Sequence, residues 1–197
     1  MEVELVAALR PVLAAFERLG VACHIGGSVA SSSHGVGRST QDVDVIADLH
    51  PTHVHPLALA LAKDFYVSEP MIEAAIRGRS CFNVIHLPSM FKVDVFVLKQ
   101  RPFDQAAFVR ARPGRVGLSE DFVEAAIASP EDVVLNKLEW FRLGDEISER
   151  QWNDVLGVLR VCSPNLDHEY LDRWSVELGV RDLLDRARAE VNPKQAD

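Results

Sequence analysis

Apolar and polar residues follow two different periods along this chain, and each change of period marks an expected element. Residues 5–19 carry apolar side chains at helical spacing and end at Gly20, which predicts an opening helix with a glycine C-cap. Residues 21–25 then read as a short buried strand. The stretch Asp42-Val43-Asp44-Val45-Ile46 alternates acidic and apolar residues, and this alternation predicts a second strand.

A hairpin is predicted further along the chain. Residues 81–87 and 92–98 look like two strands that are joined by a short turn. In the second of these strands three valines alternate with other residues, among them Asp94, so Asp94 lies on the face opposite the valines. Two helices are expected before this hairpin, at residues 53–62 and 71–76.

The pattern changes to helix from Ser119 onward. Ser129-Pro130-Glu131-Asp132 combines an N-cap, a proline at the first helical position and early acids, which together predict a helix start. Ser148 begins a capping box, Ser148-Glu149-Arg150-Gln151, that predicts the start of the next helix. Two more helical stretches are expected, at residues 167–178 and 180–191.

Length and composition agree with this organisation. With 197 residues, of which 48% are hydrophobic, the chain can bury a substantial core as one domain with a helical extension. We expect an α/β core over residues 1–117 and a helical region over residues 118–197. No apolar run approaches the length of a membrane span, and residues 1–4 lack the basic region of a signal peptide. These features predict a cytoplasmic protein without a membrane partner.

Cysteine content and charge exclude other classes. The three cysteines are widely spaced in apolar segments, which argues against a disulfide framework or a zinc site and predicts reduced core residues. The formal net charge of −8 disfavours broad nucleic-acid binding, because affinity for a phosphate backbone comes largely from Lys and Arg. One local basic run either follows an RNA backbone or forms a solvated, salt-bridged face; it consists of Arg101, Arg110, Arg112 and Arg115.

The candidate chemistry lies between residues 26 and 44. Gly26 and Gly27 close the first strand, and Asp42 and Asp44 follow after a short polar stretch. Because residues i and i+2 of a strand face the same side, both carboxylates point to one place. Hard oxygen ligands of this kind suit Mg²⁺ or Mn²⁺, which bind through carboxylates and the phosphates of a substrate. The glycines let the backbone approach a phosphate, and a helix start after them would direct free N–H groups at it.

This arrangement resembles the nucleotidyltransferase superfamily (DNA polymerase beta-like), whose signature is an apolar residue, Gly-Gly or Gly-Ser, a short helix, and Asp-x-Asp on a strand. Within the superfamily, the chain looks most like the AbiE-type toxin nucleotidyltransferases and their uncharacterised minimal relatives. The resemblance covers roughly residues 20–160 and is most specific from Gly26 to Asp44. It implies an α/β (α+β) fold with a small mixed sheet flanked by helices, and a C-terminal helical region packed on that core.

The resemblance also implies roles for the acidic residues and the glycine motif. Asp42 and Asp44 would bind two metal ions, Mg²⁺ or Mn²⁺, and Asp94 would bind the catalytic ion and help to deprotonate the acceptor. The phosphate-binding motif of the family, whose backbone N–H groups and hydroxyl contact the β and γ phosphates of an NTP, is matched by Gly26, Gly27 and Ser28.

Further nucleotide-binding residues are implied in the same way. Arg38 and Thr40, in an Arg-x-Thr-x-Asp-x-Asp run, fit phosphate binding because a guanidinium pairs well with phosphate. Lys137 and Arg142 match the Lys-Leu-x-x-x-Arg helix of the AbiE-type enzymes, and Lys137 is expected near the nucleotide. Asp154 resembles a later family motif, but this chain lacks the basic residue that usually precedes that aspartate, so its role stays open.

The implied activity is transfer of a nucleoside monophosphate from an NTP to a hydroxyl, with release of pyrophosphate. The AbiE-type likeness implies a toxin that modifies RNA, in particular a tRNA end, with an antitoxin as partner. Two other enzymes stay open: one that modifies a small molecule such as an aminoglycoside, since an acidic cleft attracts a polycation, and one that adenylylates a protein. A non-catalytic nucleotide-binding or antitoxin-like interaction module is the alternative outside enzymes.

Overall fold

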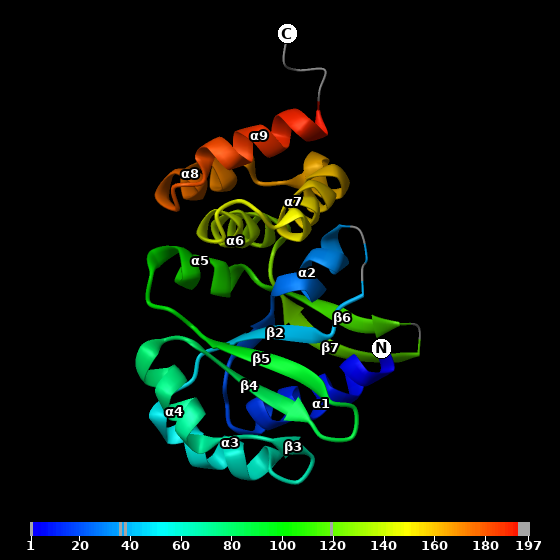
Figure 1. Cartoon of the computed structure of the whole chain (residues 1–197), viewed down its shortest axis with the longest axis vertical. Coiled ribbons are helices and arrows are strands. Elements are labelled where there is room, and N and C mark those ends of the chain that lie inside the picture. Colours follow the sequence, from blue (N-terminus) through cyan, green and yellow to red (C-terminus); the bar gives the residue numbers. More distant parts are fainter. Residues whose placement is uncertain (1, 36, 38, 119, 193–197) are drawn as a thin grey trace. The chain divides into compact units, whose positions relative to one another are not determined.

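Two compact units make up the chain in the computed structural model, which describes residues 2–35, 37, 39–118 and 120–192 (Figure 1). The sheet unit comprises residues 1–29 and 39–128, and the helical unit comprises residues 30–38 and 129–197. We expected the sheet unit to end at residue 117. It continues to residue 128, because a further strand of the sheet lies at residues 121–127.

Within the described residues, seven strands form one mixed sheet, in the order β3-β4-β5-β2-β1-β7-β6. Its strands are β1 (Cys23–Ile25), β2 (Asp42–Ala47), β3 (Phe65–Tyr66), β4 (Cys81–His86), β5 (Phe91–Val97), β6 (Arg112–Leu118) and β7 (Asp121–Ile127). β2 pairs with β5 and β1 pairs with β7 in parallel, and the other neighbours are antiparallel. The predicted mixed sheet and the predicted β4–β5 hairpin are therefore confirmed.

Three helices cover one face of this sheet, namely α1 (Glu2–Arg18), α3 (Val54–Leu61) and α4 (Glu69–Gly78), as Figure 1 shows. The short 3₁₀ helix η1 (Pro51–His53) leads into α3. On the opposite face lies α5 (Pro102–Arg110), whose Phe108 ring packs against His24 of β1 with the ring centroids 5.2 Å apart. The two faces of the sheet are thus covered by different helices.

The core of the sheet unit lies under α1, α3 and α4. Every second residue of the central strands points there and is fully buried: Val43, Val45, Ala47, Val93, Val95 and Val97. Helix α1 contacts β2 and β5, and its Val12 and Phe16 are buried as well. Burying side chains of this size stabilises the fold by about 1.5–3 kcal/mol each. The alternating residues of the same strands are left on the opposite face.

Helix α2 (Gly27–His34) begins in the sheet unit and continues into the helical unit. The helical unit further contains α6 (Pro130–Leu143), α7 (Glu149–Cys162), η2 (Ser163–Asn165), α8 (His168–Glu177) and α9 (Arg181–Val191). α6 packs on α7 and α8, and α9 packs on α7 and α8. The predicted N-caps Ser129 and Ser148 are confirmed, since each hydroxyl accepts a hydrogen bond from the backbone N–H three residues later.

The expectation of helix from Ser119 onward is wrong for residues 121–127. Residues 121–127 form β7, which pairs with β6 along its whole length and with β1 at Ile25. Glu124 and two alanines in this segment have good helix propensity, but the backbone hydrogen bonds of two neighbouring strands outweigh that local preference. The helical part begins at Pro130 instead.

The cysteines are free thiols, as predicted, but only two of them are half-buried. Cys23 and Cys162 lie partly in the interior, whereas Cys81 is exposed, which contradicts its expected place in the core. Burial raises the pKa of the Cys23 thiol to about 11. Of the helices that the structure describes, none has both the length and the apolar character that a membrane crossing requires.

His24 makes the stability of the sheet unit depend on pH. Its side chain is 6% exposed, its Nδ1 has no hydrogen-bond partner among the described residues, and desolvation lowers its pKa from 6.5 to about 4. Between these two values the unfolded chain binds more protons than the folded chain, so the free energy of unfolding falls as the pH falls from 6.5 to 4. The loss attributable to His24 is about 3 kcal/mol.

We expect the variant His24→Phe to lose about 3 kcal/mol less than the wild type between pH 6.5 and pH 4, because phenylalanine keeps the ring contact and cannot be protonated. Urea unfolding of both proteins at a series of pH values measures this difference. Parallel pH profiles of the two proteins would contradict the assignment.

Candidate active site

The pairing of β2 with β5 brings the three predicted carboxylates to one face of the sheet. Asp44 lies directly beside Asp94 in the parallel register, and Asp42 lies beside Lys92. Adjacent strands are about 4.8 Å apart, so side chains at paired positions on the same face are close neighbours. All three aspartates point away from the valine layer, as the alternation in the sequence predicted. The site therefore has three acidic groups in two adjacent strands.

Glycine is required next to Asp44. The Gly26 N–H donates a hydrogen bond to the backbone carbonyl of Asp44, at 2.9 Å, which ties the end of β1 to β2. Gly27 has a φ of +53°, and a Cβ atom at this position would lie 1.6 Å from Asp44 Oδ2. No other residue leaves room for this carboxylate. The glycine pair thus lets the acidic group lie against the backbone where α2 begins.

The start of α2 provides donors beside this carboxylate. Gly27 and Ser28 are the first two residues of α2, where backbone N–H groups have no partner within the helix. The same end of a helix carries partial positive charge, which favours an anion. The predicted phosphate-binding residues Gly26, Gly27 and Ser28 therefore lie together at one edge of the carboxylate group.

Thr40 contacts a carboxylate directly. Its hydroxyl donates a hydrogen bond to Asp42 Oδ1, at 2.8 Å, and so fixes the orientation of that side chain. In this arrangement the hydroxyl that was expected to bind phosphate holds Asp42 in position. Arg38, the other predicted member of this run, lies outside the described residues.

Sequence reasoning missed Lys92, which belongs to the same site. Its Nζ lies 2.7 Å from Asp94 Oδ2 and 3.8 Å from Asp42 Oδ2. The hydrogen bond that Lys92 donates to Asp94 raises the pKa of the ammonium group, so Lys92 stays protonated. One signal for it was present in the sequence, because Lys92 and Asp94 are two residues apart in a strand and face the same side.

Cys81 lies near the negative charge of this face, which affects the pKa of its thiol. It is the residue of β4 that pairs with Phe96 of β5, one position along the same face from Asp94. Desolvation raises the pKa of its thiol to about 11, and the negative charges of Asp94 and Asp44 act in the same direction. Both effects favour the protonated thiol.

The donor set suits a hard divalent cation, although the side chains as they stand do not enclose one. Three carboxylates on one face, beside a glycine that leaves room for Asp44, have the chemistry that Mg²⁺ or Mn²⁺ requires. Among the described residues, however, no three His, Cys, Asp or Glu side chains converge on one metal position. The ammonium of Lys92 lies between Asp42 and Asp94 instead.

The predicted residues of the helical unit are each bound to another side chain. Lys137 of α6 forms an ion pair with Asp154 of α7, with Nζ 2.8 Å from Oδ2, and both side chains are only 7% exposed. Arg142, at the end of α6, contacts both carboxylate oxygens of Asp182 at 2.6 and 2.7 Å and also pairs with Glu146. The structure therefore brings Lys137 together with Asp154, and it directs Arg142 to α9.

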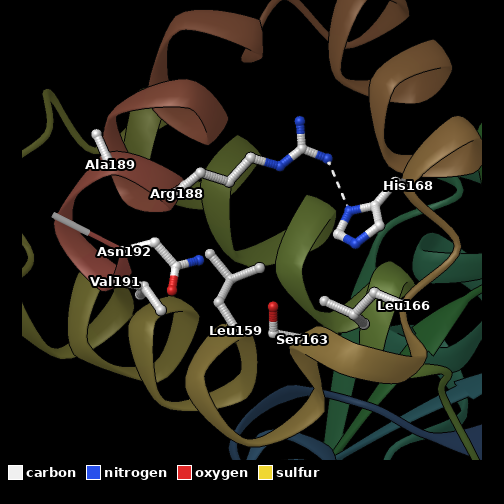
Figure 2. A pocket seen from close by; sticks show the side chains of 8 residues that line it. All are labelled: Leu159, Ser163, Leu166, His168, Arg188, Ala189, Val191 and Asn192. Atoms are coloured by element: carbon white, nitrogen blue, oxygen red, sulfur yellow. Dashed lines mark hydrogen bonds between the residues drawn. The ribbon is translucent and has the colours of Figure 1, made fainter. Parts of the chain in front are cut away.

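A pocket of about 470 Å³ lies within the helical unit, between α7, α8 and α9 (Figure 2). Figure 2 shows Arg188 reaching across it to His168, with 3.4 Å between Nη2 and Nδ1. Asp172 also pairs with this guanidinium at 2.6 Å and neutralises its charge. None of the predicted site residues lines the pocket, whose walls are formed by Leu159, Ser163, Leu166, His168, Arg188, Ala189, Val191 and Asn192.

Comparison with solved structures identifies the fold class. The solution structure of the antibiotic-resistance factor ANT(2'')-Ia matches 99% of this chain and 98% of its own, with a TM-score of 0.54 and 13% identity. ANT(2'')-Ia in a crystal structure with adenylyl-2''-tobramycin matches 90% of this chain and 98% of its own, with a TM-score of 0.56 and 13% identity. An antigenic nucleotidyltransferase-like protein from Paracoccidioides brasiliensis matches 92% of this chain and 91% of its own, with a TM-score of 0.52 and 17% identity.

These matches give the chain the fold of nucleotidyltransferases, as the sequence predicted. A scan against protein-family models found no match, and a search of curated proteins found none either. At identities of 13–17% the likeness establishes the fold. The closer resemblance to AbiE-type toxins stays a prediction.

Replacement of Gly27 tests the packing of Asp44. We expect Gly27→Ala to destabilise the protein by more than Gly20→Ala, a matched control whose φ of +66° is also left-handed but whose surroundings are open within 4 Å. Gly20→Ala carries only the backbone cost of about 1–2 kcal/mol, whereas Gly27→Ala adds the clash with the carboxylate. Urea unfolding measures both values, and equal losses would contradict the close contact.

Replacement of Lys137 tests the buried ion pair. We expect Lys137→Met to lower the free energy of unfolding by about 3–5 kcal/mol, because Asp154 is left buried and charged without its cation. The double variant Lys137→Met/Asp154→Leu should recover much of this loss. Arg181→Ala, which removes exposed ion pairs with Asp185 and Asp172, serves as control and should change stability little. A small effect of Lys137→Met in denaturant unfolding would speak against the pair.

Proposed function

We propose that this protein is a metal-dependent nucleotidyltransferase that moves a nucleoside monophosphate from an NTP to a hydroxyl group. The observation that supports this most is the placement of Asp42, Asp44 and Asp94 on one sheet face, next to a helix start at Gly27 where Asp44 leaves room for no side chain. The nucleotidyltransferase fold of the solved neighbours agrees with it.

Each residue of the site has a role in this reaction. Asp42, Asp44 and Asp94 would hold two Mg²⁺ or Mn²⁺ ions, which when bound neutralise the charge that develops on the transferred phosphoryl group and on the pyrophosphate. The acceptor oxygen forms a bond to the α-phosphorus as the bond from that phosphorus to pyrophosphate breaks. Asp94, the carboxylate on β5, takes the proton of the acceptor hydroxyl.

The triphosphate would bind at the start of α2. Gly26 and Gly27 carry no side chain that would block a phosphate there, and the backbone N–H groups and the Ser28 hydroxyl in the first turn are the donors that a phosphate would use. Arg38 would add a cation, and Thr40 would act by holding Asp42 in its orientation. Lys137 and Arg142, which match the helix motif of the AbiE-type enzymes, each pair with a carboxylate of the helical unit, Asp154 and Asp182 respectively.

The charge of the chain favours a small polycationic acceptor over RNA. The net charge is −8, and in the local basic run Arg101 pairs with Asp104 while Arg115 pairs with Glu124 and lies over the Phe122 ring. A cationic molecule such as an aminoglycoside would be attracted to acidic groups that repel a phosphate backbone. ANT(2'')-Ia, a protein with the same fold, has been solved with adenylyl-2''-tobramycin.

RNA is the second candidate acceptor. It rests on the AbiE-type resemblance of the motifs from Gly26 to Asp44 and of the helix with Lys137. Under this hypothesis the substrate is a tRNA end, the partner is an antitoxin and the protein is cytoplasmic. A transfer assay with both classes of acceptor tests which of them the protein modifies.

The purified full chain is incubated with each α-³²P-labelled NTP and Mg²⁺ or Mn²⁺, in the presence of an aminoglycoside panel or total tRNA. We expect label in an acceptor, and we expect Asp42→Ala/Asp44→Ala to reduce transfer about a thousandfold, since loss of the metal ligands removes several kcal/mol of transition-state stabilisation. Asp64→Ala, an exposed acidic residue elsewhere on the sheet unit, should retain wild-type activity.

The position of the label identifies the acceptor. Label in the aminoglycoside fraction supports the small-molecule enzyme, and label in tRNA supports the RNA-modifying enzyme. NTP binding without transfer to either, or to protein, would contradict the proposed activity and favour a nucleotide-binding module.

A further inference from the structure

Lys92 places a positive charge where the candidate metal ligands meet. Its Nζ lies 2.7 Å from Asp94 Oδ2 and 3.8 Å from Asp42 Oδ2, so the ammonium connects the carboxylates of two adjacent strands. The side chain of Asp94 is 14% exposed, while those of Lys92 and Asp42 are about 40% exposed, at 39% and 41%. The cation therefore lies at the open side of a partly buried acidic group.

The sheet itself determines this position. Lys92 is the residue of β5 that pairs with Asp42 of β2, and it precedes Asp94 by two residues on the same face. Lys92 therefore has Asp42 beside it on β2, and it has Asp94 two residues further along its own strand. Its flexible four-carbon stem lets the ammonium reach both or turn away to solvent.

A divalent ion would bind oxygen atoms of the same carboxylates. Mg²⁺ binds carboxylate oxygens at about 2.0–2.1 Å and demands near-octahedral geometry. Asp94 Oδ2 now accepts from the Lys92 ammonium, and no three acidic, His or Cys side chains within the described residues converge on a metal position. The carboxylates that a metal site requires are present, but the Lys92 ammonium lies between Asp42 and Asp94.

We propose that Lys92 is an internal competitor for the metal, because its ammonium pairs with Asp42 and Asp94 and opposes the binding of a divalent ion to those carboxylates. This inference rests on the proposed function, because it concerns the same carboxylates. Lys92 is thus a positioning residue that lowers the affinity of the site for free metal ions. Its positive charge also offsets part of the repulsion among the three carboxylates.

Direct titration of Mn²⁺ tests this without any assay of activity. The electron paramagnetic resonance signal of free Mn²⁺ reports how much ion is bound to the full-length wild type, Lys92→Met and Lys92→Arg. We expect Lys92→Met to bind Mn²⁺ about tenfold more tightly, since a unit positive charge beside Asp42 and Asp94 no longer opposes the ion. Lys92→Arg keeps the charge and should stay near the wild-type affinity.

Two controls locate the effect. Lys63→Met removes one exposed positive charge elsewhere in the sheet unit and should leave Mn²⁺ affinity unchanged. In the Asp42→Ala/Asp44→Ala background, Lys92→Met should no longer increase the affinity. Circular dichroism and thermal unfolding of each variant establish that it is folded before its affinity is compared.

The outcomes separate this inference from the proposed function. Tighter binding by Lys92→Met alone, lost in the aspartate double variant, supports it. Equal or weaker binding by Lys92→Met, when the wild type binds Mn²⁺, overturns the role of Lys92 and leaves the proposed function intact. If neither protein binds Mn²⁺ with or without an NTP, both proposals are overturned.

Discussion

The parallel pairing of β2 with β5 determines where the charges of the candidate site lie. Its register aligns Asp44 with Asp94 and Val45 with Val95, so the carboxylates meet on one face and the valines on the other. A slip of one residue would turn the aspartates into the apolar layer beneath α1, α3 and α4, at a cost of several kcal/mol for each buried charge. The apolar face of these two strands therefore maintains the geometry of the acidic face.

Three carboxylates so close together repel one another, and each has a different neighbour that offsets this. Thr40 donates a hydrogen bond to Asp42, and the ammonium of Lys92 pairs with Asp94. Asp44 lies against Gly27 at the start of α2, where the positive end of the helix favours an anion. These neighbours offset the repulsion among the three carboxylates in the folded chain.

In the helical unit, charged residues act chiefly between helices. Lys137 and Asp154 join α6 to α7 inside the unit, and Arg142 joins α6 to α9 at its surface. Asp132, which is fully buried, accepts hydrogen bonds from Ser129 and from Tyr170 of α8. A Lys or Arg that matches a family motif can therefore also stabilise the fold, because a buried charge requires a partner wherever the helices place it.

What the sequence determined by itself is local. The period of two in β2 and β5 was enough to place Asp42, Asp44 and Asp94 opposite the valines. The caps at Ser129 and Ser148 were enough to predict where two helices start. Strand alternation and helix caps both depend on residues only a few positions apart. Tertiary structure decided the rest. Residues 121–127 became β7 because two strands pair with them, and Lys92 came between Asp42 and Asp94 because the register of β2 and β5 put it there. Strand pairing depends on contacts between distant segments, and no local pattern contains that information.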